Sequence, residues 1–132
     1  VRIPPSWSWP KPAQRDRAGR PHLPVLLGGG AGPTLFAQVV EYADGWMPIG
    51  GAGLREALPR LHAALEAAGR DPAQVEVVPF ATLPDHGKLD HYARLGVTET
   101  VFDLPSGPRD EVLPVLDRYA ALVAERRGWS PG

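Results

Sequence analysis

The residues best suited to chemistry form a glycine-rich stretch that reads GGGAGPT, from Gly28 to Thr34. Glycine has no Cβ, so its backbone N–H groups can approach a bound anion closely. The N-terminus of a following helix adds a favourable dipole, and the Thr34 hydroxyl can cap that helix or donate to a phosphate oxygen. The pattern is therefore compatible with an anion site, but taken alone it favours the simpler interpretation, a tight strand-to-helix turn without a ligand.

This stretch matches neither of two common nucleotide-binding patterns. A third glycine at the spacing of the dinucleotide pattern G-x-G-x-x-G is missing before the helix begins, and so is the lysine of a phosphate-binding P-loop. Any anion it holds is therefore bound through another arrangement.

A second group of candidates follows the expected strands, at the end where ligands bind in parallel α/β folds. Trp46 can wall a ring-binding pocket there, whereas core packing is the simpler explanation for Met47. Other polar, aromatic or proline residues occupy equivalent strand ends: Phe80, Thr82, Asp103 and Pro105. Asp103 can hold a substrate group, but a helix-capping or solvent-facing role is equally compatible with its position.

The four histidines, His22, His62, His86 and His91, predict no metal site. They lack the paired spacing of zinc-binding helices, and the chain has no cysteine to supply thiolate ligands. A nucleophile elbow of the form G-x-S-x-G is missing as well. No catalytic residue is assigned from these patterns.

Four short apolar runs alternate with four helical patterns along the chain. We expect strands over 25–28, 45–49, 75–82 and 97–104, and helices from Pro33 or Thr34 to about 43, over 54–68, over 85–95 and over 109–126. The clearest helix carries Leu54, Leu58, Leu61 and Leu65 at spacings of three and four, with Pro59 predicting a kink or a late start. Gly69 and Gly96 are expected to end their helices.

This alternation predicts consecutive β/α units and a parallel sheet, so the fold class is α/β. Residues 1–23 are rich in proline and are expected to form an irregular connecting segment, followed by one domain over 24–132. The pattern alone fits either a small open, doubly wound sheet or four units of a (β/α)₈ barrel, which takes about 250 residues when whole.

Composition limits the partners. The 132 residues are 43% hydrophobic and 22% charged with a formal net charge of −1, which is ordinary for a globular chain and predicts no nucleic-acid or lipid partner. No apolar run reaches the about 20 residues of a membrane span, and the chain does not open on a signal-peptide pattern. Together with the missing cysteine, this favours the cytoplasm, and the excess of arginine over lysine suggests a bacterial source. Because residue 1 is valine, we expect the chain to be part of a longer one.

The order of four motifs resembles the luciferase-like monooxygenase family, and most closely its members that use the deazaflavin coenzyme F420. The motifs are WPKP from Trp9, PVLLGGG from Pro24, YADGWMP from Tyr42, and the late pair LGVTETVF from Leu95 and LDRYA from Leu116. The resemblance extends from about Trp7 to Val123. Residues 15–20 depart from it as a short insertion in a connecting loop.

The resemblance implies the C-terminal half of a TIM-type barrel, with residues 25–28 as the fifth strand and 97–103 as the eighth. It implies an oxidoreductase that carries out hydride transfer or monooxygenation on a small organic molecule, with coenzyme F420 as cofactor and FMN as the alternative. It also favours the ligand interpretation of the glycine stretch, so the expected cofactor-binding residues are Gly28, Gly29, Gly30, Gly32, Thr34 and Trp46. The catalytic residues would belong to the other half. A homodimer, or completion by a missing N-terminal half, is therefore expected, and a catalytically silent half-barrel or a small-ligand binding domain is the alternative.

Overall fold

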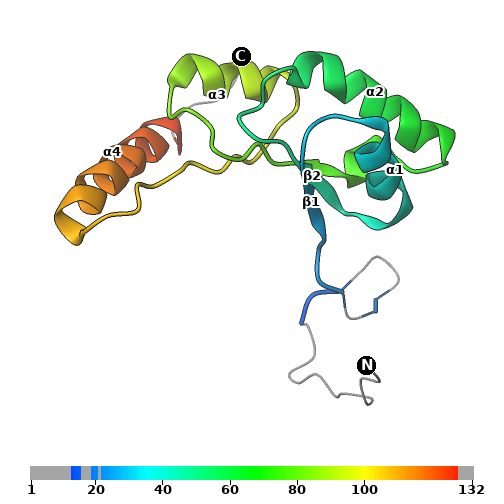
Figure 1. The fold of residues 1–132 in the computed structure, drawn as a ribbon, viewed down its shortest axis with the longest axis horizontal. Coiled ribbons are helices and arrows are strands. Elements are labelled where there is room, and N and C mark those ends of the chain that lie inside the picture. Colours follow the sequence, from blue (N-terminus) through cyan, green and yellow to red (C-terminus); the bar gives the residue numbers. More distant parts are fainter. Residues whose placement is uncertain (1–12, 16–18, 21, 128–132) are drawn as a thin grey trace.

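The computed structural model describes residues 13–15, 19, 20 and 22–127. In chain order the elements are β1 (Leu26–Gly28), α1 (Pro33–Tyr42), β2 (Gly45–Met47), α2 (Leu54–Ala67), η1 (Pro72–Gln74), β3 (Glu76–Val77), α3 (His86–Arg94) and α4 (Arg109–Arg127). The strands are parallel and lie in the order β1-β2-β3. In Figure 1 the helices follow one another along an arc from α1 to α4, with the strands on its inner side. The chain is thus mixed α/β with a small parallel sheet, as predicted.

The start of α1 and the path of α2 follow from local sequence. Proline at the first helical position begins α1 at Pro33, because a helix leaves that N–H without a partner in any case. The stripe of α2 is buried as predicted, through Leu54, Leu58, Leu61 and Leu65. Because α2 begins at Leu54 and continues through Pro59, the expectation of a late start is wrong.

Glycine ends both α2 and α3 by the same mechanism. Gly69 and Gly96 have φ of 72° and 81°, a left-handed conformation that glycine adopts without a steric penalty. After α2, the N–H of Arg70 donates to the carbonyl of Leu65 at 2.9 Å. This is the Schellman arrangement, and it satisfies a carbonyl that the helix end would leave unpaired. The predicted ends of these two helices are confirmed.

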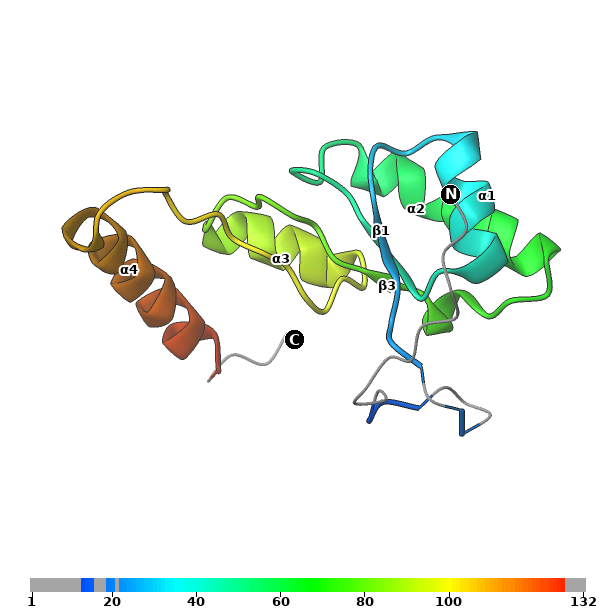
Figure 2. The ribbon, with the colours of Figure 1, turned by 60° about the horizontal axis from the view of Figure 1, so that its bottom comes forward.

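The two faces of the sheet have different surroundings. Leu27, Trp46 and Val77 lie in register across the three strands and pack in or against the core formed with α1 and α2. Because side chains alternate along a strand, the preceding residues, such as Leu26 and Glu76, point to the opposite face. Both side chains are exposed there. Figure 2 shows α1 and α2 together beside β1, with α4 far from them.

We call this second side the bare face. Beyond the strands, an isolated parallel bridge joins Ile49 to Phe80, so their side chains share the same face. Ile49 is 72% exposed and Phe80 is 38% exposed. Val78 points to the same face as Glu76 and Phe80 by alternation along the strand, but it is buried. The described residues therefore leave most of the bare face uncovered, whereas a parallel sheet ordinarily has both faces covered.

The predicted fourth strand over 97–104 is not formed in the described residues, and the prediction of four complete β/α units is not confirmed. Val101 nevertheless bonds to the chain after β3, donating to the carbonyl of Pro79 at 2.9 Å and accepting from the N–H of Thr82 at 3.0 Å. In a regular parallel ladder the two partners of one residue enclose a single residue, whereas Pro79 and Thr82 enclose two. Between them Ala81 has φ of 55°, a left-handed conformation that interrupts the ladder as a β-bulge does.

The remaining predicted elements are mostly present. The strands predicted over 45–49 and 75–82 are shorter than expected, whereas α3 and α4 match their predictions closely. Most of the predicted irregular segment 1–23, with Trp7 and Trp9, lies outside the described residues. Among the helices that are described, none combines the length and apolar character needed to cross a membrane.

Candidate functional site

The first glycine loop, Gly29–Gly32, joins β1 to α1 at the carboxyl edge of the sheet, where the strands end. Its first N–H donates to the carbonyl of Met47 at 3.3 Å, which ties the loop to β2. Gly29 has φ of 147°, a conformation that side chains rarely adopt. A Cβ placed on Gly30 would meet no heavy atom within 4 Å. The backbone conformation at position 29 therefore requires glycine, and the space over Gly30 is open to a ligand. Gly28 is the last residue of β1 and directly precedes the loop.

Trp46 supports this loop from the side of the core. Its indole N–H donates to the carbonyl of Gly29 at 2.9 Å, and its ring meets Phe36 edge-on at 5.3 Å. In a planar trans peptide the carbonyl of Gly29 and the N–H of Gly30 point in opposite directions, so the Gly30 N–H faces away from the core. Trp46 is only 1% exposed. Its predicted contact with a ligand stays a prediction, and its observed contact is with the loop itself.

Thr34 lies in the first turn of α1 rather than at its cap. Gly32 is the N-cap residue, no side chain caps the helix, and Pro33 precedes Thr34 within it. The expectation that Thr34 caps the helix is therefore wrong, although its exposed hydroxyl remains free to meet a ligand. No acceptor among the described residues receives the backbone N–H of Thr34 or Leu35. These two donors add to the positive end of the helix dipole.

A second glycine loop, Gly50–Gly53, joins β2 to α2 at the same edge. Gly50, Gly51 and Gly53 have φ of 65°, 62° and 71°. The hydroxyl of Tyr92, from α3, donates to the carbonyl of Gly50 at 3.1 Å. A Cβ on Gly51 would overlap that hydroxyl, so glycine is required there by space as well as by conformation.

The sequence analysis assigned no role to this second loop, which directly follows the strand predicted over 45–49. A signal was present, because the tetrapeptide GGAG occurs at 29–32 and again at 50–53. In both places it stands directly before a helix, and its last glycine is the N-cap residue. In both places an aromatic side chain donates to the carbonyl of its first glycine.

Apolar side chains border the loops at the carboxyl edge. Ile49 and Leu83 are 72% and 70% exposed. Thr82, in contrast, is buried and lies 2.6 Å from the hydroxyl of Thr100, so it contributes to packing at this edge. Asp103 is exposed, and only its backbone carbonyl is bonded, to the hydroxyl of Tyr119 at 2.8 Å.

At the opposite, amino edge, Asp44 joins three parts of the chain. Its carboxylate accepts from the backbone N–H of Val25 at 2.7 Å and lies 2.8 Å from Nε2 of His22. Burial raises the pKa of Asp44. The two hydrogen bonds and the positive charges of His22 and Arg70 lower it by more than burial raises it, so the net pKa lies below its ordinary value. Because ligand sites in such folds lie at the carboxyl edge, we interpret this cluster as structural.

Nearby, the guanidinium of Arg70 caps the end of α1. Its Nη1 donates to the carbonyls of Val39 and Val40 at 2.6 and 2.8 Å, and its Nη2 donates to that of Ala43 at 2.9 Å. A cation at a helix C-terminus is also favourable to the helix dipole. The planar fork of arginine suits several carbonyls at once.

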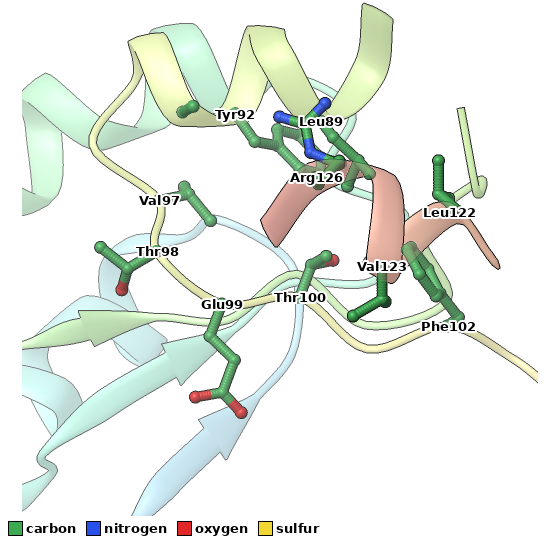
Figure 3. Close-up of a pocket in the computed structure, with 11 residues that line it drawn as sticks. Leu89, Tyr92, Val97, Thr98, Glu99, Thr100, Phe102, Leu122, Val123 and Arg126 are labelled. Carbon is green, nitrogen blue, oxygen red and sulfur yellow. The ribbon is translucent and has the colours of Figure 1, made fainter. Parts of the chain in front are cut away.

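A cavity of about 350 Å³ lies between α3, α4 and the segment 97–102. Figure 3 shows its mostly apolar lining, which includes Leu89, Tyr92, Phe102, Leu122 and Val123. At its rim Arg126 forms an ion pair with Asp90 at 2.8 Å and so holds the end of α4 against α3. The ring of Tyr92 thus borders this cavity, while its hydroxyl reaches the second glycine loop.

The histidines are dispersed. His86 lies 3.2 Å from Glu125 on the exposed surface, and His91 stacks obliquely beside Tyr92. Within the part of the chain that the structure describes, no three histidine, aspartate or glutamate side chains converge as a metal site would require.

Parallel strands joined to helices by glycine loops at the carboxyl edge define a protein of the α/β class. A sequence model of one family, the luciferase-like monooxygenases, matches residues 5–84, which is more than half of the chain. The chain belongs to the luciferase-like monooxygenase family. The expected resemblance is therefore confirmed at the level of the family.

Relatives come from mycobacteria. The chain is 36% identical over 126 residues to an uncharacterized protein of Mycobacterium bovis and to uncharacterized proteins of two Mycobacterium tuberculosis strains. These alignments cover 94% of this chain but 42% of each relative. The chain thus spans less than half the length of the relatives that it matches.

Proposed function

We propose that this chain holds the phosphate-bearing tail of a flavin-type cofactor in a luciferase-like oxidoreductase. The observation that carries the proposal is the first glycine loop, whose carbonyl at Gly29 is held inward by Trp46 while the N–H of Gly30 points outward. Together with the N–H groups of Thr34 and Leu35, this loop offers several donors to one anion.

The residues present fit a phosphate group. The space over Gly30 is open, the exposed hydroxyl of Thr34 stands in the first turn of α1, and the helix dipole favours negative charge. We assign the phosphate to Gly29, Gly30, Gly32 and Thr34, with Gly28 ending the strand that leads to them. Trp46 acts through its hydrogen bond to the loop.

Coenzyme F420 is the cofactor that we favour, because the motifs of this chain are closest to the family's deazaflavin-dependent members, and FMN is the alternative. When bound, such a cofactor supplies hydride transfer or monooxygenation of a small organic substrate. The residues of this chain bind and orient the tail, and the exposed apolar side chains Ile49 and Leu83 provide part of a pocket wall. None of them is assigned a catalytic role.

We also propose that the bare face is covered by further β/α units, either from the rest of a barrel or from a second copy of this chain. The exposed side chains of Leu26, Ile49 and Phe80 support this, since a parallel sheet with one face in water is unusual. A dimer of two copies, packed through their bare faces, would contain two sets of glycine loops but none of the residues of the other half of the barrel. Such an assembly would bind a cofactor tail without catalysing a reaction.

The phosphate assignment is tested by comparing ligands that differ only in that group. FMN should bind the chain at least about tenfold more tightly than riboflavin, the difference expected for a few charge-assisted hydrogen bonds. Coenzyme F420 should likewise bind more tightly than its deazaflavin core without the tail. Quenching of tryptophan fluorescence and calorimetry would measure both pairs.

The substitution Gly30→Ala probes the loop itself. Because a Cβ on Gly30 would meet no heavy atom within 4 Å and Gly30 does not have a positive φ, the added methyl group should leave the fold intact and obstruct the anion. We expect FMN binding to weaken about tenfold and riboflavin binding to stay unchanged. Gly87→Ala, in α3, is the control: its Cβ would meet only the Asp85 carboxylate, at 3.3 Å, and it should affect neither ligand. Equal affinity of the unsubstituted chain for FMN and riboflavin would contradict the proposed function.

A further inference from the structure

We propose that Tyr92 is a positioning residue that orients the second glycine loop toward the same anion as the first. This inference rests on the proposed function and extends it to a residue of α3. It starts from the repeated tetrapeptide GGAG at 29–32 and 50–53.

The two loops are supported at the same position. Trp46 donates to the carbonyl of the first glycine in one loop, and Tyr92 donates to the carbonyl of the first glycine in the other. Both aromatic side chains are almost fully buried, at 1% and 2% exposure, so each donor comes from the core. Two unrelated side chains thus perform one task at two successive strand ends.

Holding that carbonyl inward determines where the next N–H points. Because the peptide is planar and trans, a Gly50 carbonyl directed at Tyr92 leaves the N–H of Gly51 pointing the opposite way. No acceptor among the described residues receives that N–H. The N–H of Gly50, by contrast, is bonded to the carbonyl of Phe80 at 2.7 Å, which fixes the loop from its other side.

The conformation also depends on a close fit. Gly51 lies so near the hydroxyl of Tyr92 that a Cβ there would overlap it, and three glycines of the loop are left-handed. A loop of such residues has many accessible conformations when unsupported. The hydrogen bond from Tyr92 therefore selects one of them, in which the start of α2 and the N–H of Gly51 face the carboxyl edge.

The test compares Tyr92→Phe with Tyr119→Phe. Both substitutions remove a hydroxyl that donates to a backbone carbonyl, but Tyr119 bonds to Asp103 and lies away from both glycine loops. Tyr92→Phe should weaken FMN binding about tenfold, the effect of one lost hydrogen bond of ordinary strength, and should leave riboflavin binding unchanged. Tyr119→Phe should leave the ratio of the two affinities unchanged.

Hydrogen exchange provides a readout that needs no ligand. Tyr92→Phe should speed exchange at the amides of residues 51–54 and leave those of 30–35 unchanged. In the unsubstituted chain, FMN but not riboflavin should slow exchange at the amide of Gly51, a measurement that covers the case in which Tyr92→Phe does not fold. Unchanged exchange at 51–54, or an equal loss of FMN and riboflavin affinity, would overturn the positioning role. Equal binding of FMN and riboflavin by the unsubstituted chain would instead overturn the proposed function and with it the shared anion, whereas the exchange result would still decide whether Tyr92 orients the loop.

Discussion

At the scale of single residues, Asp44 shows how one carboxylate can hold a parallel sheet at its amino edge. Asp44 directly precedes β2. Its carboxylate accepts a hydrogen bond from the N–H of Val25, which directly precedes β1, and lies within hydrogen-bond distance of the His22 ring. Its hydrogen bonds and the charges of His22 and Arg70 outweigh the effect of burial and keep its pKa below the ordinary value of 3.8. The folded chain therefore favours the ionised form more than the unfolded chain does.

This difference predicts how stability depends on pH. A group whose pKa is lowered by folding stabilises the fold fully above its ordinary pKa, and this contribution is lost as the pH falls through the lowered value. Asp44→Asn should lower the free energy of unfolding at neutral pH by about 1 kcal/mol, because the side chain is partly exposed. It should also flatten the loss of stability in acid. Urea unfolding across that range, with the exposed Asp117→Asn as control, would measure both effects, and identical acid profiles for Asp44→Asn and the unsubstituted chain would refute the assignment.

At the scale of elements, the end of α1 depends on a side chain from beyond α2. Arg70 reaches the carbonyls of Val39, Val40 and Ala43. The Val39 carbonyl also accepts the N–H of Ala43 at 3.2 Å, whereas the helix end leaves the later carbonyls without a backbone partner. Lysine has the same charge but lacks the planar fork, so it cannot donate to three carbonyls in this geometry.

We expect Arg70→Lys to lower the free energy of unfolding by about 1–2 kcal/mol, the range for one or two lost hydrogen bonds. Arg55→Lys, on the exposed side of α2, should change it by less than about 0.5 kcal/mol. Denaturant unfolding of both variants tests this, and equal stabilities would show that charge alone is sufficient at the end of α1.

The elements also show which features of the fold can be predicted from sequence. The stripe of α2 and the glycines after α2 and α3 were predictable, because spacing and left-handed conformation are local properties. The fourth strand was not, since the left-handed Ala81 that interrupts its ladder carries no local pattern. Nor was the role of Tyr92, whose partner Gly50 lies 42 residues away in the chain. The turn of the first glycine loop between a strand and a helix was predictable, whereas its support by Trp46 depends on packing.

At the scale of the whole molecule, the bare face predicts self-association of the chain when no other strands are supplied. Leu26 and Ile49 project from it, and contiguous exposed apolar surface tends to mark an interface. Sedimentation should therefore show a dimer or a larger species.

Leu26→Lys or Ile49→Lys should shift this equilibrium toward the monomer, because a charge on the bare face opposes its burial. Tyr42→Lys, at the exposed end of α1, is the control and should leave the distribution unchanged. A compact monomer of the unsubstituted chain would show that the bare face needs no cover.

The double role of Trp46 has a thermodynamic consequence. The same indole fills the centre of the core and bonds to the first glycine loop, so the loop cannot lose that support unless the core opens. If the proposed site binds a cofactor tail, ligand capture and global unfolding are linked by mass action, and saturation with FMN should raise the melting temperature of the entire α/β unit. The tail would then act as one more part of the fold.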